Sequence, residues 1–164
     1  MLGPMKKALV LLATFLAPMA NAGVMAFEFL APRHVMPSDV KATLRSLAAE
    51  AITDCQRQLG STIEQTDDYF TAVPIELAPH RSNAVLVLPT LDCYAFHGAH
   101  AIKFWVFLLT PVPSLVLSGA QDAMEVQKSS SNGLLDIITY YGTETTEYRY
   151  DGKTYVEHKR KRSE

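Results

Sequence analysis

The densest group of potential metal ligands in this chain consists of Asp92, Cys93, His97 and His100. A His-Gly-Ala-His spacing can bring two imidazoles to one metal ion, but zinc sites usually need three or four protein ligands. Because Cys93 has a competing use in a disulfide, the candidate ligands that remain are Asp92, His97 and His100. We treat these three as the candidate site of a small hydrolase or metal-binding protein. The alternative is that both histidines are solvated residues of a loop between two strands.

Signatures of known catalytic machinery are absent from the sequence. It contains no G-x-S-x-G nucleophile elbow, no H-E-x-x-H helix and no papain-like context around either cysteine. It also contains no P-loop, no G-x-G-x-x-G turn and no acidic calcium loop of the D-x-D-x-D-G type. We therefore expect no cofactor and no enzyme activity.

Tyrosines are concentrated near the end of the chain, where five of the seven lie between positions 140 and 155. Tyrosine offers a large contact area at low conformational-entropy cost, so an exposed tyrosine face would recognise a protein or a glycan. The candidate face consists of Tyr140, Tyr148, Tyr150 and Tyr155. The alternative is that strand alternation sends half of these side chains into the core.

A short basic run, His158 to Arg162, follows Glu157, which we expect to end the last strand. Runs of this kind are usually irregular and solvated, and we assign residues 158–164 to a basic tail. A functional tail would hold the protein to anionic envelope polymers or to lipid, at about 1 kcal/mol for each basic residue near a charged surface.

The first 22 residues have the pattern of a secretory signal peptide. Lys6 and Lys7 precede an apolar run from Ala8 to Leu16, and Ala20-Asn21-Ala22 is a small-residue cleavage site. The apolar run is much shorter than the roughly 20 residues that span a bilayer, so we expect cleavage after Ala22 and no transmembrane anchor. The natural start could be Met5, which precedes the basic pair directly. The sequence thus predicts a periplasmic or secreted protein.

Cleavage would leave 164 − 22 = 142 residues, enough for one domain with its own core. Without Lys6 and Lys7, the count becomes 13 basic and 17 acidic residues, a net charge near −4. A weakly acidic domain is a poor nucleic-acid binder, so no nucleic-acid partner is expected. We divide the mature chain into an extended arm at 23–37, a domain at 38–157 and the tail.

The two cysteines, Cys55 and Cys93, have no third cysteine to compete with. In an oxidising compartment their pairing is the default, and closing a loop of about 39 residues would stabilise the fold by roughly 3 to 4 kcal/mol. The alternative is two separate buried thiols. A redox role would favour a Cys-x-x-Cys pair, so we expect the disulfide to be structural.

One helix is expected between Ser38, a good N-cap, and Gly60, a good stop. Apolar residues from Val40 to Leu59 recur at helical spacing, and Cys55 lies on the same stripe. Before this helix, the arm has room for a short edge strand within residues 24–30.

After the helix, the composition favours strands. Pro74 should place the first of them at a sheet edge or a bulge. Asp151-Gly152 should form a type I′ hairpin that sets Tyr148 opposite Tyr155, and Gly119 should lie in a turn. The segments of β-type composition are 69–77, 84–91, 102–110, 114–118, 124–129, 134–141, 147–150 and 153–157, with a loop at 129–133. We predict an α+β fold in which one helix packs on a curved antiparallel meander of six to seven strands.

Two short phrases near the end of the chain consist of turn residues and tyrosines. Asn132, Gly133 and Asp136 match an N-G-x-x-D-[IL] phrase. A second phrase, Y-x-Y-D-G-x-x-Y, is matched by Tyr148, Tyr150, Asp151, Gly152 and Tyr155. Through these two phrases the last part of the chain resembles small exported bacterial proteins of uncharacterised function. The resemblance implies export but no activity.

These observations together predict a small exported binding or inhibitory module whose partner is a protein or an envelope polymer. The second hypothesis is a small envelope hydrolase or metal-binding protein that uses Asp92, His97 and His100.

Overall fold

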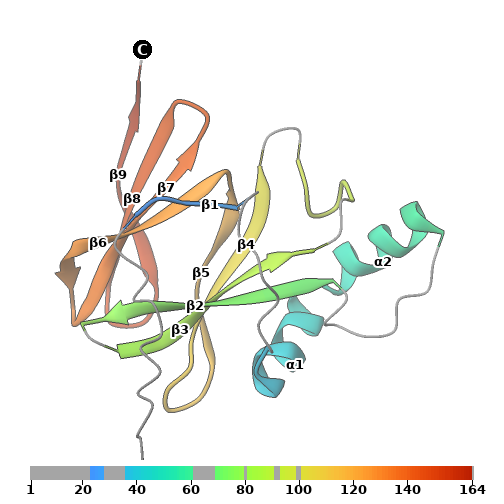
Figure 1. Cartoon of the computed structure of the whole chain (residues 1–164), viewed down its shortest axis with the longest axis horizontal. Coiled ribbons are helices and arrows are strands. Elements are labelled where there is room, and N and C mark those ends of the chain that lie inside the picture. Colours follow the sequence, from blue (N-terminus) through green and yellow to red (C-terminus); the bar gives the residue numbers. More distant parts are fainter. Residues whose placement is uncertain are drawn as a thin grey trace, which may run out of the picture.

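The computed structural model describes residues 23–27, 36–60, 69–79, 81–90, 93–98 and 101–163. Within these ranges the chain forms two helices and nine strands, in three layers: the helices, a four-stranded sheet and a five-stranded sheet (Figure 1). The predicted α+β class fits this arrangement, but the predictions of one helix and one curved sheet were wrong. The predicted signal peptide, residues 1–22, lies outside the described residues.

The helical segment is split in two, into α1 (Ser38–Leu47) and α2 (Ala49–Leu59). Ala48 lies between them with φ −105° and ψ 10°, and Gly60 ends α2 in the left-handed region as expected. Val40 and Leu44 are buried, whereas 52% of Leu47 is exposed. The apolar residues from Val40 to Leu59 therefore do not form one continuous buried face of a single helix. No proline or glycine marks the break, so residue spacing alone could not reveal it.

Ser38 is the first helical residue rather than the N-cap. Pro37 precedes the helix, and no side chain caps its first amides. The Ser38 hydroxyl instead lies 3.3 Å from Oδ1 of Asp39, whose negative charge favours the helix start.

The central layer is an antiparallel sheet of four strands in chain order: β2 (Phe70–Ala78), β3 (Arg81–Pro89), β4 (Ile102–Leu108) and β5 (Ser114–Gln121). Pro74 lies in the edge strand β2, as predicted, and the register shifts on either side of Glu76. The face toward the helices carries Phe70, Ala72, Val85, Val87, Trp105 and Phe107. The other face carries Ile75, Leu77, Ala84, Leu86, Phe104 and Val106. Both faces of β3 are thus covered, which explains its nearly unbroken apolar run.

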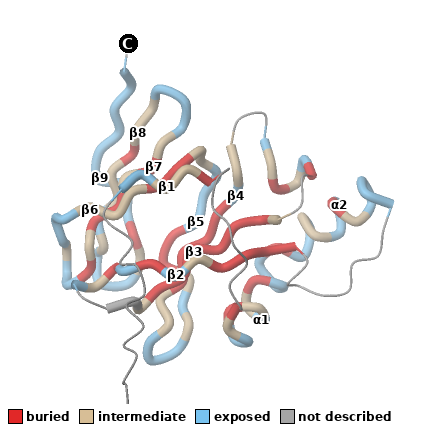
Figure 2. Tube along the Cα trace, in the orientation of Figure 1, coloured by how far each residue is buried: buried red, intermediate tan, exposed pale blue. Residues whose placement is uncertain are grey.

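The outer layer has the strand order β1-β6-β7-β8-β9. Its members are β1 (Met25–Ala26), β6 (Ala123–Ser131), β7 (Leu134–Tyr141), β8 (Glu144–Tyr150) and β9 (Tyr155–Arg162). Met124 and Ile137 are fully buried against the central sheet. Figure 2 shows the buried residues gathered where the layers face one another, and exposed residues along β9 and in the turn between β7 and β8.

The chain passes from the central to the outer sheet at Asp122, not in a turn at Gly119. The Asp122 amide donates to the carbonyl of Tyr140, and the Asp122 carbonyl accepts from Phe27. Gly119 lies within β5, directly opposite Phe104. A side chain at Gly119 would bring its Cβ to 3.0 Å from the Phe104 ring, so a close cross-strand approach explains this glycine.

The hairpin between β6 and β7 turns on two residues, Asn132 and Gly133. Their φ values are 48° and 84°, as a type I′ turn requires. Ser130 and Ser131, which we expected in a loop, belong to β6.

The hairpin between β8 and β9 is present, but its predicted register was wrong. Tyr150 lies opposite Tyr155, and Tyr148 lies opposite Glu157. The connection spans residues 151–154, and Oδ1 of Asp151 accepts the amides of Lys153 and Thr154 at 2.8 Å. These bonds, first the one from Thr154, lower the pKa of Asp151. A side-chain cap therefore replaces the expected type I′ turn.

The predicted basic tail is also wrong, because residues 158–162 belong to β9 and residues 159–162 pair with β8. Figure 1 shows this end of β9 standing away from the helices and the central sheet.

Among the described residues, no helix has the length and apolar character needed to cross a membrane.

Candidate binding surface

β9 is the edge strand of the outer sheet, and its second half is strongly basic. His158, Lys159, Arg160, Lys161 and Arg162 are consecutive and all exposed. We call these five residues the β9 surface. Because the strand is paired with β8, their backbone positions are fixed, unlike those of a loose tail.

The basic side chains alternate between the two faces of the sheet. Lys159 lies opposite Glu147 and Lys161 opposite Thr145, on the face that points away from the central sheet. Arg160 lies opposite Thr146, which is itself buried on the core side. Positive charge is therefore present on both faces of this edge.

Arg160 is partly neutralised by its neighbours. Its guanidinium donates to Glu157 at 2.6 Å and lies 3.4 Å from Glu144. The hydrogen bond to Glu157, and then the charges of both carboxylates, raise the pKa of Arg160. Within the described part of the chain, Lys159 and Lys161 form no ion pair.

Some backbone groups of β9 face away from β8, and no other described strand pairs with this edge. The Ser163 amide donates to the carbonyl of Thr143 at 3.0 Å, which identifies these two as a hydrogen-bonded pair. Hydrogen-bonded and non-hydrogen-bonded pairs alternate along an antiparallel ladder. Lys161 and Lys159 thus turn their backbone groups toward β8, whereas those of Arg160 and Arg162 point outward from the sheet edge.

The four candidate tyrosines do not form one exposed face. Tyr155 is only 6% exposed, and its hydroxyl donates to the carbonyl of Leu135 at 2.5 Å. Tyr148 and Tyr150 pack against the same core. Tyr148, Tyr150 and Tyr155 thus face the core, as the alternative to an exposed tyrosine face predicts.

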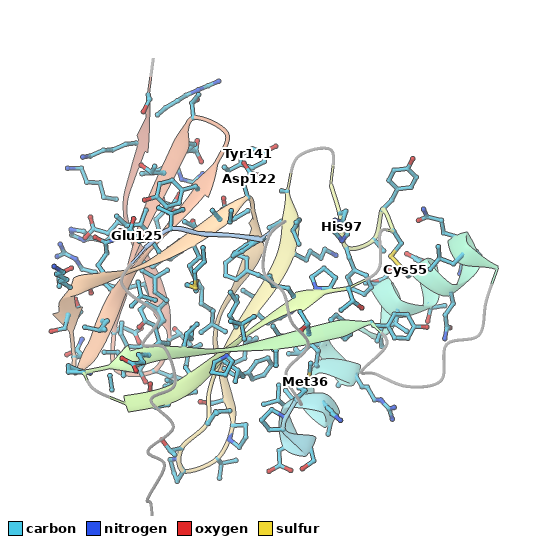
Figure 3. The ribbon with its side chains drawn as sticks, in the orientation of Figure 1. Met36, Cys55, His97, Asp122, Glu125 and Tyr141 are labelled. Carbon is cyan, nitrogen blue, oxygen red and sulfur yellow. A yellow bond between two sulfur atoms is a disulfide. The ribbon has the colours of Figure 1, made fainter. Side chains whose placement is uncertain are left out.

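Tyr140 lies on the opposite face from that core. Its hydroxyl donates to Oε2 of Glu125 at 2.5 Å, and burial, then this hydrogen bond and charge, raise the pKa of Tyr140 to about 12. Tyr141, outside the candidate set, is 45% exposed. Figure 3 places Tyr141 and Glu125 on the outer sheet and Asp122 where the chain enters it, all away from Cys55.

The two phrases of the C-terminal resemblance are joined by a hydrogen bond. Nδ2 of Asn132 donates to the carbonyl of Tyr150 at 2.7 Å. Asp136 is 2% exposed, and its Oδ1 has no partner among the described groups. Asn132 thus connects two hairpins.

Of the candidate metal ligands, the structure describes only His97. Asp92 and His100 lie outside the described residues. His97 pairs with Ile102 in an isolated bridge, and its buried Nε2 has no hydrogen-bond partner in the described structure. The described residues contain no cluster of three His, Cys, Asp or Glu side chains that could hold a metal ion. The metal site at Asp92, His97 and His100 therefore stays a prediction.

Cys55 and Cys93 form the disulfide expected from the sequence, with 2.16 Å between the sulfurs and 5.6 Å between the Cα atoms. Both cysteines are buried. The bond ties α2 to the segment after β3, and the side chain of Gln58 also accepts the amide of Tyr94 there. Its position between helix and sheet supports a structural role.

No protein-family model matches this chain, and the comparisons with curated proteins and with solved structures give no match either.

Proposed function

We propose that this protein is a small exported binding module that holds an anionic partner on the β9 surface. The main support for this function is that five consecutive basic residues lie in one exposed edge strand that is paired with β8. A preformed array of charges attracts a partner without first losing the conformational entropy of a loose tail.

The charge distribution supports this proposal. Residues 144–163 contain six Lys and Arg residues and four Asp and Glu residues, a net charge of 6 − 4 = +2. The whole chain carries −2, so the remaining residues carry −4. Such a separation orients an anionic partner toward the β9 surface and weakens as salt screens it.

Export is supported by the N-terminal signal pattern and by the buried disulfide, which is typical of oxidising compartments. In a bacterial envelope, anionic partners include acidic polymers and acidic segments of other exported proteins. Binding there requires no catalytic group.

A charge-reversal experiment tests the proposal. Lys159→Glu with Lys161→Glu changes the β9 surface, and Lys103→Glu with Lys128→Glu makes the same charge change at exposed positions of β4 and β6. The probe is fluorescently labelled polyglutamate, followed by anisotropy at low and at moderate salt. Circular dichroism verifies that both variants fold.

We expect the β9 variant to lose about tenfold or more in affinity, which corresponds to about 1.4 kcal/mol, and the control to lose less. The parent should also bind more weakly at higher salt. Equal losses in the two variants would show only a net-charge effect and would refute a site at β9.

A further inference from the structure

We infer that the anionic partner is an extended acidic polypeptide segment that adds to β9 as a sixth strand of the outer sheet. This inference rests on the proposed function and names the class of partner for the same surface. Strand addition obtains affinity from main-chain hydrogen bonds and specificity from alternate side chains.

The backbone of β9 has outward groups that can pair with another strand. The outward N–H and C=O groups of Arg160 and Arg162 are spaced two residues apart, as in any sheet edge that accepts another strand. Figure 1 shows this end of β9 beyond the other two layers, with no described element along its outer side.

The side chains of β9 favour an acidic partner strand. A strand beside β9 would meet Arg160 and Arg162 on one face of the sheet and Lys161 on the other. Acidic residues at consecutive positions of the partner would therefore each face a cation. A partner with alternating acidic and apolar residues would match only one face.

The same pattern argues against a second copy of this chain. Pairing β9 with another β9 would set Lys and Arg residues against one another, and like charges directly opposite destabilise a sheet. The basic edge thus rejects itself while accepting an acidic strand.

A β-bulge limits the length of the docking edge. Glu157 lies opposite Tyr148 and Lys159 opposite Glu147, so His158 is an extra residue without a partner in this register. Regular pairing resumes at Lys159 and continues to Arg162. The partner therefore gains few main-chain bonds, and its affinity depends on charge as well.

Other edges lack this combination. β2 contains Pro74 and shifts its register twice, and β1 contains only two described residues. β5 has no charged side chain in its sequence SLVLSGAQ. Only β9 offers outward backbone groups and cations together within the described sheets.

Amide hydrogen exchange of the full chain, read by NMR, tests the inference directly. In the free protein the amides of Lys159 and Lys161 should be protected, and those of Arg160 and Arg162 should exchange rapidly. Added hexaglutamate should protect Arg160 and Arg162. Charge binding without strand addition would leave both exchanging.

A matched peptide separates the two proposals. Hexaglutamate with N-methyl groups on alternate peptide nitrogens keeps every carboxylate but loses the donors of one edge. We expect its affinity to be at least about fivefold lower, as for loss of hydrogen bonds worth about 1 kcal/mol each. Equal affinities would refute strand addition and leave the proposed anion binding intact. Binding of neither peptide, with no effect of charge reversal on polyglutamate, would refute both.

Two variants test the same point from the protein side. Arg162→Pro and Arg162→Ala both remove one charge, but only proline also removes the outward N–H, at an edge position where proline is tolerated. We expect hexaglutamate to bind Arg162→Pro more weakly than Arg162→Ala. Equal binding would contradict strand addition. Vesicles of pure phosphatidylglycerol that bind tightly while hexaglutamate does not would identify a membrane partner and overturn the inference.

Discussion

The hydroxyl of Tyr155 in β9 donates to the carbonyl of Leu135 in β7, across the intervening strand β8. Tyr155 is also one of the buried residues of the core between the sheets, and its ring lies 5.5 Å from that of Tyr150. This one side chain fastens the start of the basic strand to the body of the protein.

Removal of that hydroxyl should weaken the fold. We expect Tyr155→Phe to lower the free energy of unfolding by about 1 to 2 kcal/mol, because a buried hydrogen bond is lost while the ring remains. Urea unfolding measures the change. Tyr141→Phe, at an exposed tyrosine, is the control and should change stability by less than about 0.5 kcal/mol. Equal effects would contradict the role of the bond.

The disulfide should contribute a larger amount. We expect Cys55→Ala with Cys93→Ala to lose about 3 to 4 kcal/mol, the chain-entropy value for a loop of this length. Thermal and urea unfolding measure the loss, and the parent treated with dithiothreitol should approach the variant. Thiol titration of the unreduced, denatured parent should find none. Two titratable thiols would show that the bond does not form.

The sequence predicted local features where a single residue type has a specific conformational or chemical requirement. Two cysteines allow one intramolecular pairing, Asn132-Gly133 supplies two positive φ values, and Pro74 fits an edge strand. Each of these predictions agrees with the structure because it depends on few neighbours.

The layer to which each strand belongs could not be predicted in the same way. Alternation of apolar residues tells which face of a strand is buried, but it does not tell which sheet the strand joins, and β5 and β6 lie in different sheets although only Asp122 separates them. Turn length adds to the difficulty, because the four-residue connection 151–154 sets Tyr155 opposite Tyr150, whereas the two-residue turn that we expected would pair Tyr155 with Tyr148.

The β9 surface was recognised as basic but assigned to a tail, because five like residues show no alternation. The missed signal lies in the partner strand, where Glu144 and Glu147 precede the turn at a spacing that places them beside Arg162 and Lys159. Opposite charges at paired positions favour a hairpin.

The close approach of Gly119 to Phe104 can be tested by substitution. Gly119→Ala would press a methyl group against Phe104, which is buried and packs on the Phe27 ring at 5.4 Å. We expect a loss of about 1 to 3 kcal/mol, as for other overpacked sites. Gly98→Ala is the control, because its added methyl makes only an ordinary contact with Ala101. If the two variants unfold at the same urea concentration, Gly119 does not face Phe104.

Alkaline pH should destabilise the fold through Tyr140 and Tyr155. Burial, then hydrogen bonding to Glu125 and its charge, raise the pKa of Tyr140 to about 12, and burial, followed by the charge of Asp136, raises the pKa of Tyr155. An unfolded tyrosine ionises near pH 10, so above that pH the unfolded chain binds fewer protons than the folded one. The stabilisation by both protonated hydroxyls is complete below about pH 10 and is lost as pH rises through the folded pKa values.

Urea unfolding at several pH values between about 9 and about 11 checks this, since unfolded tyrosines titrate within that range. We expect the free energy of unfolding of the parent to fall steadily as pH rises above 10. Tyr140→Phe with Tyr155→Phe should be less stable at pH 9 but should show a shallower fall, because phenylalanine has no proton to lose. Parallel curves for parent and variant would mean that these two hydroxyls are not held protonated by the fold.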